Sequence, residues 1–254
     1  MEEETECALQ SGERLEPLSK RVSVIVGNGF AFGTDTILLA SFSMPKRGEV
    51  CADFGTGCGT IPLLWCERSR PASVLAVELQ PAACGMARRS AAVNGFGETI
   101  RVAECDVRKL GARPDAKRGG FDLVACNPPY KEAGAAIVSA DERERIARHE
   151  TVCGFSEIAA SAAALLRWGG RFCCCMRPER LCGTVLALRE AGLEPKRLRF
   201  VQQRASSPPF LFLLQANRGG RPGVEVGPVL LLEENGALSE EMARIYGDYK
   251  EGKA

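Results

Sequence analysis

From Glu49 onwards, apolar runs of strand length alternate with stretches that have helical spacing. The apolar runs cover residues 49–54, 73–79, 99–105, 121–127 and 171–176. The helical stretches begin near Ile61 and also cover residues 81–95, 155–170 and 178–192. Strands that alternate with helices in this way predict an α/β fold with a mostly parallel sheet and helices on both of its faces.

The two ends of the chain carry further elements. Residues 21–26 and 29–32 flank Asn28-Gly29, a pair typical of a tight turn, and predict an N-terminal β-hairpin. Residues 34–44 predict a helix capped by Thr34 or Asp35. Residues 193–202 and 209–217 predict a closing pair of strands. We therefore expect a flexible segment 1–20 and a single domain 21–254, made of a hairpin and helix (21–48), a core (49–217) and a C-terminal strand and helix (218–254).

Length and composition restrict the class of protein. A chain of 254 residues that is 45% hydrophobic can build one large domain. Its acidic start, "MEEETE", lacks the features of a secretory signal, and its longest apolar run, near "PFLFLLQA", is too short to span a bilayer. We expect a cytoplasmic protein that uses no membrane. The 12 cysteines form no C-x-x-C pair, so buried reduced thiols are expected and a metal site is not.

The formal net charge of +1 conceals an uneven distribution of charge. Residues 160–221 contain eleven Lys and Arg against three Glu, a net charge of +8, and the rest of the chain sums to −7. A basic segment of this kind suits a polyanionic partner such as RNA. Solvated faces whose charges are balanced by acids elsewhere in space are an equally good interpretation.

A glycine-rich turn follows the strand 49–54. "DFGTGCGT", residues 53–60, places Gly55, Gly57 and Gly59 between a strand and a helix, where backbone N–H groups can approach a ligand closely. The spacing differs from the G-x-G-x-x-G of dinucleotide-binding proteins. Glu78 ends the next strand, where a carboxylate can accept from both hydroxyls of a ribose. Asp106, after the third strand, either accepts from an adenine amino group or caps a turn.

The most specific motif is "CNPPY", residues 126–130, after the strand 121–127. Two adjacent prolines end the strand and hold Asn127 and Tyr130 on a stiff turn. An amide and an aromatic ring are thus projected from the end of a strand, which is a costly way to build an ordinary loop.

Together, the glycine turn, the acidic strand end and the NPPY sequence resemble the class I S-adenosylmethionine-dependent methyltransferases. "FGTDTILLASF", "DFGTGCGTIPLL", "FDLVACNPPY", "ARHE" and "RPERL" are similar to segments of the bacterial tRNA adenine-N6 methyltransferases that modify an adenine beside the anticodon of valine tRNA. The resemblance runs from about Val22 to Tyr249. It implies a Rossmann-like fold with a seven-stranded sheet, S-adenosylmethionine as cofactor, S-adenosylhomocysteine as product, and tRNA as partner of a monomeric enzyme. It also implies N-methylation at a conjugated nitrogen, which needs no strong general base. In that chemistry Asn127 Oδ1 and the Pro128 carbonyl accept the two N–H bonds of a planar amino group and favour a tetrahedral nitrogen, while Pro129 stiffens the turn and Tyr130 stacks on the base.

The residues expected at the site form two sets. The cofactor set comprises Thr34, Asp35, Asp53, Gly55, Thr56, Gly57, Gly59, Glu78, Leu79, Asp106, Val107 and Asn127. The substrate set comprises Tyr130, Lys131, Arg148, His149, Arg197 and Arg199. Lys131 stands where many relatives have an aromatic residue. Arg148, His149 and Glu150 are expected to have a structural or substrate-orienting role, since the chemistry needs no base.

Two other functions are compatible with these motifs. The release-factor glutamine methyltransferases carry the same NPPY motif, because a glutamine amide is also a planar nitrogen. They normally have an N-terminal helical substrate domain, whereas only about twenty residues precede the predicted hairpin here, and the basic segment also favours RNA. A cofactor-binding RNA-binding protein without turnover is the weaker alternative, since the NPPY motif is intact.

Overall fold

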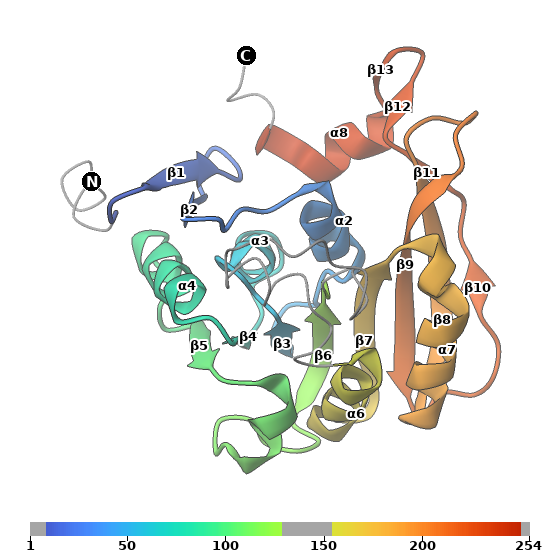
Figure 1. Cartoon of the computed structure of the whole chain (residues 1–254), viewed down its shortest axis with the longest axis horizontal. Coiled ribbons are helices and arrows are strands. Elements are labelled where there is room, and N and C mark those ends of the chain that lie inside the picture. Colours follow the sequence, from blue (N-terminus) through green and yellow to red (C-terminus); the bar gives the residue numbers. More distant parts are fainter. Residues whose placement is uncertain (1–8, 129–153, 250–254) are drawn as a thin grey trace, which may run out of the picture.

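The computed structural model describes residues 9–128 and 154–249, and its centre is a nine-stranded sheet in the order β10-β8-β9-β7-β6-β3-β4-β5, with β11 also paired to β8 (Figure 1). Its seven long strands are β3 (Val50–Phe54), β4 (Ser73–Glu78), β5 (Ile100–Glu104), β6 (Phe121–Cys126), β7 (Leu166–Met176), β8 (Leu193–Gln202) and β9 (Pro209–Arg218). Neighbours from β5 to β7 are parallel, and β9 is antiparallel to both β7 and β8. The predicted mostly parallel sheet is confirmed. The short strands β10 (Glu225–Val226) and β11 (Leu230–Leu231) add to the seven that were expected.

Helices cover both faces of the sheet (Figure 1). One face is covered by α2 (Thr34–Phe42), α3 (Thr60–Arg68), α4 (Pro81–Val93) and α8 (Glu240–Tyr246). The other face is covered by the 3₁₀ helix η1 (Val107–Ala112), α6 (Phe155–Leu165) and α7 (Leu181–Glu190). The remaining elements are η2 (Pro178–Arg180), η3 (Gly247–Tyr249) and a small hairpin of β12 (Glu233–Glu234) and β13 (Ala237–Leu238). Within the described part, no helix is both long and apolar enough to cross a bilayer.

The core consists of two clusters of apolar side chains, one on each side of the sheet, because successive residues of a strand point to opposite faces. In β7, Cys173 and Cys175 belong to the cluster beneath α2 and α3, whereas Cys174 belongs to the cluster beneath α6. All three are at most 1% exposed. The ten cysteines of the described residues are free thiols, and eight of them are buried as predicted, whereas Cys105 is partly exposed and Cys182 is exposed.

The N-terminal hairpin is present, but its first strand lies earlier than predicted. β1 (Glu13–Pro17) pairs antiparallel with β2 (Ser23–Gly27), so residues 13–17 are not part of a loose segment. The expected Asn28-Gly29 turn forms, with both residues at positive φ, but residues 29–32 contribute only the single bridge between Phe30 and Gly27. Pairing to Arg89 of α4 stabilises β1, because the guanidinium donates to the Glu13 carboxylate at 2.8 Å.

Two predicted helix ends differ in the structure. The N-cap of α2 is Gly33, which has no side chain to cap with, so the expectation of a Thr34 or Asp35 cap was wrong. Both residues instead occupy the first helical turn. Helix α6 ends at Leu165 and not at Gly169-Gly170, because Leu166 is already extended and pairs with Phe121 of β6.

Candidate active site

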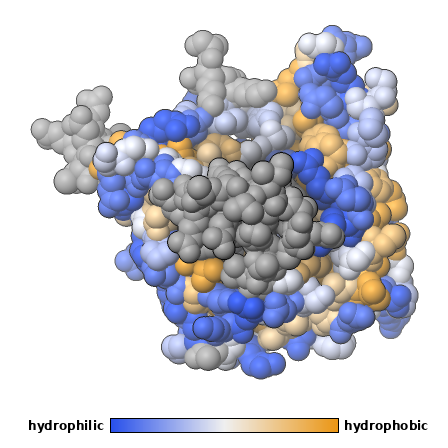
Figure 2. Space-filling model, in the orientation of Figure 1, coloured by the Kyte–Doolittle hydropathy of each residue, from blue (hydrophilic) through white to orange (hydrophobic). Residues whose placement is uncertain are grey.

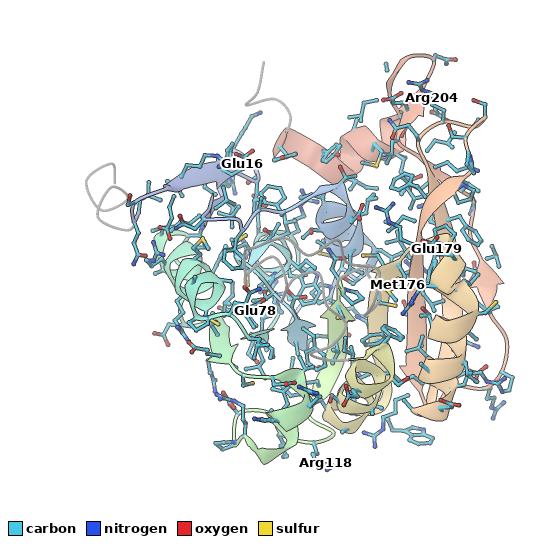
Figure 3. All side chains as sticks on the ribbon, viewed as in Figure 1. Glu16, Glu78, Arg118, Met176, Glu179 and Arg204 are labelled. Carbon is cyan, nitrogen blue, oxygen red and sulfur yellow. The ribbon has the colours of Figure 1, made fainter. Side chains whose placement is uncertain are left out.

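Four strands end at one edge of the sheet and bring most of the predicted residues together. The connections from β3 to β4 and β5 run in one direction, whereas β6 lies on the other side of β3, so the order of the strands reverses between β3 and β6. Ligands of open α/β sheets bind at such a switch point, beyond the carboxyl ends of the strands. Figure 3 shows Glu78 at the end of β4 and Met176 at the end of β7, along this same edge.

The glycine turn after β3 has the conformation that its sequence requires. Gly55, Gly57 and Gly59 have φ angles of +71°, +56° and +90°, where a side chain is strained. A Cβ added at Gly55 or Gly57 would meet nothing within 4 Å, whereas one at Gly59 would contact Ala87 of α4 at 3.4 Å. The first two glycines therefore leave open space for a ligand, and the third allows α3 and α4 to approach each other.

The carboxylate of Glu78 is bound to this turn. Its Oε2 accepts from the backbone nitrogen of Gly57 at 3.0 Å, and its Oε1 accepts from Leu79 at 2.8 Å and from Gln80 at 2.9 Å. The residue is 8% exposed. Three backbone donors orient the carboxylate, and unused lone pairs remain for a ligand hydroxyl. Leu79, which is 39% exposed, lies beside it as an apolar surface.

Asp53, at the end of β3, is the least satisfied polar group of the site. It is 1% exposed, and no well-formed hydrogen bond to either carboxylate oxygen comes from the described residues. Burial raises the pKa of this carboxyl to about 7. The nearby Thr56 hydroxyl acts in the opposite direction, and the negative charge of Glu78 raises the pKa further. A buried carboxylate of this kind fits a cationic ligand that would compensate its charge.

Asp106 and Val107 follow β5 at the same edge. Asp106 caps η1 by accepting from the Arg108 backbone nitrogen at 2.9 Å, and the Arg108 guanidinium also donates to it. This hydrogen-bonded pairing with Arg108 lowers the pKa of Asp106. The structure thus shows the capping role, and acceptance from an adenine stays a prediction. Val107 packs against the core beneath η1.

Thr34 and Asp35 lie at the start of α2. The Thr34 hydroxyl is 3.1 Å from the hydroxyl of Tyr246 in α8, and Tyr246 in turn stacks near Tyr249. The C-terminal helix therefore holds the beginning of α2. A part for Thr34 and Asp35 in covering a cofactor remains a prediction.

Asn127 follows β6 and is held through both ends of its amide. Its Nδ2 donates to Thr36 Oγ1 at 3.2 Å, and its Oδ1 accepts from Cys175 Sγ at 3.1 Å. Pro128 is buried beside it. The sequence did not single out Thr36 or Cys175. The only signal for Thr36 was its position near the start of a helix, and the only signal for Cys175 was its position near the end of a strand. The predicted residues Pro129, Tyr130, Lys131, Arg148, His149 and Glu150 lie outside the described residues.

Arg197 and Arg199, predicted to bind substrate, lie on β8 and have partners within the protein. The Arg197 guanidinium lies 4.2 Å from the ring centroid of Phe42 and donates to the Phe42 carbonyl at 3.3 Å. Arg199 forms a two-pronged ion pair with Glu241 at 2.5 and 2.6 Å. Their contacts with a phosphate stay predictions. To bind a phosphate, Arg199 would have to share its guanidinium between Glu241 and the phosphate or leave Glu241.

Acids from elsewhere in the chain balance much of the basic segment. Four of its arginines pair with acids outside residues 160–221, in the pairs Arg167–Asp122, Arg171–Glu49, Arg199–Glu241 and Arg204–Glu233. On the face shown in Figure 2, hydrophilic and apolar residues are interspersed along the right-hand rim, without one continuous hydrophilic band. Acids from elsewhere in the chain therefore offset about half of the segment's net charge of +8. Among residues 9–128 and 154–249, no cluster of three or more His, Cys, Asp and Glu could hold a metal ion.

Comparison with known proteins agrees with this geometry. The family model "Methyltransferase small domain" matches residues 24–180. A Flavobacteriaceae bacterium protein named tRNA1(Val) (adenine(37)-N6)-methyltransferase is 28% identical over 144 residues, 57% of this chain and 58% of that protein. An Escherichia coli O157:H7 protein of the same name is 30% identical over 179 residues, 65% of this chain and 71% of that protein.

Solved structures support the same fold. A predicted O-methyltransferase from Agrobacterium tumefaciens superposes with a TM-score of 0.69 at 21% identity, over 85% of this chain and 97% of that one. The order of strands, the glycine turn and the matched residues lead to one conclusion. The chain belongs to the methyltransferase small domain family and has its Rossmann-like class I fold.

Proposed function

We propose that this protein transfers a methyl group from S-adenosylmethionine to the N6 amino group of an adenine in tRNA. The observation that carries the proposal is the amide of Asn127, held at the end of β6 beside the strand whose end bears the glycine turn. The relatives described above are named for adenine 37 of tRNA1(Val). We propose an adenine beside the anticodon of valine tRNA as the acceptor here, and S-adenosylhomocysteine as the second product.

The cofactor part of the site fits S-adenosylmethionine in charge and in shape. The absence of side chains at Gly55 and Gly57 leaves the backbone open to close approach. Asp53 offers an uncompensated buried carboxylate to a cationic amino acid moiety, and Glu78 offers a fixed acceptor to ribose hydroxyls. When bound, S-adenosylmethionine supplies an electrophilic methyl group, and its sulfur keeps the electron pair as the carbon–sulfur bond breaks.

Asn127 and Pro128 act on the acceptor nitrogen. The lone pair of an amino group conjugated to a purine ring is delocalised, so the nitrogen is a weak nucleophile. Asn127 Oδ1 and the Pro128 carbonyl accept the two N–H bonds and favour the tetrahedral nitrogen, whose lone pair is then localised. The nitrogen loses one proton to solvent after the new N–C bond has formed, so the side chains need only position the reactants.

An adenine beside the anticodon lies in a single-stranded loop, where it can be splayed out of its stack without the opening of a duplex. Tyr130, from the same motif, is proposed to stack on it. Because mature tRNA is the acceptor, we propose that the enzyme works in the cytoplasm, and we propose that it works as a monomer.

The test is transfer of radiolabel from S-adenosylmethionine to three acceptors in parallel, namely tRNA lacking the modification, bulk protein and buffer alone. We expect label in tRNA and its recovery as N6-methyladenosine after nuclease digestion, at a rate about 10²–10³-fold lower with Asn127→Ala. Label in protein and not in tRNA would replace the proposal with glutamine-N5 methylation. Binding of tRNA without any transfer would replace it with a non-catalytic role.

A further inference from the structure

Two residues from distant parts of the chain hold the side-chain amide of Asn127. Thr36 comes from the first turn of α2 and accepts from Asn127 Nδ2 at 3.2 Å. Cys175 comes from the end of β7 and donates from Sγ to Asn127 Oδ1 at 3.1 Å. The thiol of Cys175 belongs to a residue with no exposed surface. The amide is thus clamped between a helix and a strand that pack against the same core cluster.

Such a clamp answers a requirement of the proposed chemistry. The terminal torsion of an asparagine side chain is broad and roughly two-fold, so the backbone alone does not decide which way its oxygen and nitrogen face. If the amide turned, Asn127 would present N–H groups to the N–H groups of the target, and neither would find an acceptor. An unpaired buried donor costs about as much as a lost hydrogen bond, which is enough to reduce turnover.

We propose that Thr36 and Cys175 are positioning residues that keep Asn127 Oδ1 directed at the amino group to be methylated. The inference rests on the proposed function of Asn127 and adds two residues that act through it. Thr36 holds the amide nitrogen on the α2 side, and the thiol holds the oxygen on the β7 side. A thiol is a weak donor, and an amide oxygen has two lone pairs, so a bond to Cys175 does not by itself use up the acceptor capacity of Oδ1.

The chain contains a matched control for Cys175. Cys173 lies two residues earlier on β7, faces the same core cluster and is 1% exposed. Substitution of either cysteine by alanine removes one sulfur atom from the same face of the sheet. Only the Cys175 substitution also removes a contact with Asn127. A loss due to packing would therefore affect both variants, and a loss due to positioning would affect one.

The first experiment measures steady-state kinetics on tRNA for Cys175→Ala, Cys173→Ala, Thr36→Val and Thr36→Ser. We expect Cys175→Ala and Thr36→Val to lower kcat by about tenfold each, the cost of one hydrogen bond in the transition state. The KM for tRNA and the Kd for S-adenosylmethionine should stay within about twofold, because ground-state binding is not involved. Thr36→Ser should restore most of kcat, and Cys173→Ala should match the unsubstituted enzyme in kcat.

The second experiment does not depend on activity. The infrared difference spectrum between the unsubstituted protein and Cys175→Ala isolates the S–H stretching band of Cys175. We expect this band to be shifted to low frequency by its bond to the amide, and Asn127→Ala should shift it back. The corresponding band of Cys173 should not respond to Asn127→Ala.

Each outcome decides the inference. Equal losses of kcat in Cys175→Ala and Cys173→Ala, or no rescue by Thr36→Ser, would overturn the positioning role while leaving tRNA methylation intact. If Asn127→Ala does not shift the S–H band of Cys175, the positioning role is overturned by a measurement that uses no substrate. Failure of the unsubstituted protein to methylate tRNA would reject the proposed function instead, and the spectroscopic result would still show whether the clamp exists.

Discussion

The carboxylate of Glu78 accepts a hydrogen bond from the backbone nitrogen of Gly57 at 3.0 Å, which joins the end of β4 to the glycine turn after β3. Two motifs 21 residues apart in sequence therefore form one unit before any ligand binds. A carboxylate that backbone donors already orient loses little entropy when it accepts from a ribose.

Glu78→Ala should weaken the binding of S-adenosylmethionine by about 1.5–3 kcal/mol, because it removes a desolvated acceptor for two hydroxyls. Glu78→Gln should also bind S-adenosylmethionine less tightly, since an amide nitrogen in place of one oxygen cannot accept from the backbone. Isothermal titration calorimetry measures both. Glu104→Ala is the control, since Glu104 is the register partner of Glu78 on β5 but is exposed and pairs with Arg88. Unchanged affinity in Glu78→Ala would refute the assignment.

Asp53→Asn should stabilise the protein and weaken its binding of cofactor. Burial raises the pKa of the Asp53 carboxyl from 3.8 to about 7, so the folded protein takes up a proton that the unfolded chain does not hold between these values. The unfolding free energy should therefore fall as the pH rises from about 4 to about 7 and stay low above it. In Asp53→Asn the contribution of this carboxyl to the pH dependence disappears, and we expect the unfolding free energy at pH 8 to rise by roughly 1–3 kcal/mol.

Urea denaturation across this pH range measures the slope, and calorimetry measures the expected loss of affinity, about tenfold, for a cationic cofactor. Asp115→Asn is a control of opposite sign. Its hydrogen-bonded pairing with Arg113 lowers the pKa of Asp115. The ionised Asp115 therefore stabilises the folded protein at neutral pH, and this contribution is lost on acidification. An Asp53→Asn protein with the original pH dependence would show that Asp53 is not the group responsible.

The sequence predicts what depends on local pattern and misses what depends on distant partners. The glycine turn, the seven long strands and the strand end at Asn127 follow from spacing, alternation and prolines. β1 was missed because "ERLEP" is polar and contains a proline, and its strand forms only by pairing with β2 and Arg89. The partners of Asn127 lie 91 and 48 residues away in sequence, so no local signal could have shown them.

Charge illustrates the same limit. The net positive segment favoured RNA, but four of its arginines pair with carboxylates from other elements once the chain is folded, as Arg199 does with Glu241. Composition cannot distinguish a free basic surface from one that is neutralised in space.

Arg199 is expected to stabilise the fold in addition to any contact with RNA. Its two-pronged pairing lowers the pKa of Glu241, so Arg199→Ala and Glu241→Ala should each reduce the unfolding free energy at pH 7 by about 0.5–1 kcal/mol. If Arg197 and Arg199 also bind phosphates, their joint replacement should raise the KM for tRNA and flatten its salt dependence, because fewer counterions are released. Glu241→Ala, which frees Arg199, should leave that slope as steep or steeper. If the salt dependence of the KM for tRNA is the same in all variants, neither arginine contacts a phosphate of the tRNA.

Tyr130, which lies outside the described residues, is predicted from the motif to stack on the splayed base. Tyr130→Ala should lose roughly 1–3 kcal/mol of base stacking, measured as a fall in kcat/KM on tRNA. Tyr130→Phe keeps the ring and should keep most activity. If Tyr130→Phe were as impaired as Tyr130→Ala, the hydroxyl and not the ring would be the working group.

Asn127→Ala separates chemistry from binding. The amide acts on the amino group mainly as that nitrogen becomes tetrahedral, so its removal should lower kcat by about 10²–10³-fold, as the loss of a preorganised transition-state contact does. The Kd values for S-adenosylmethionine and tRNA, from calorimetry and filter binding, should change little, because an interaction that strengthens mainly in the transition state contributes little to ground-state binding. Asn127→Asp retains an acceptor oxygen toward Cys175 but loses the donor toward Thr36, so it should lie between Asn127→Ala and the unsubstituted enzyme. Near-normal turnover by Asn127→Ala on a verified tRNA substrate would show that the nitrogen is activated elsewhere.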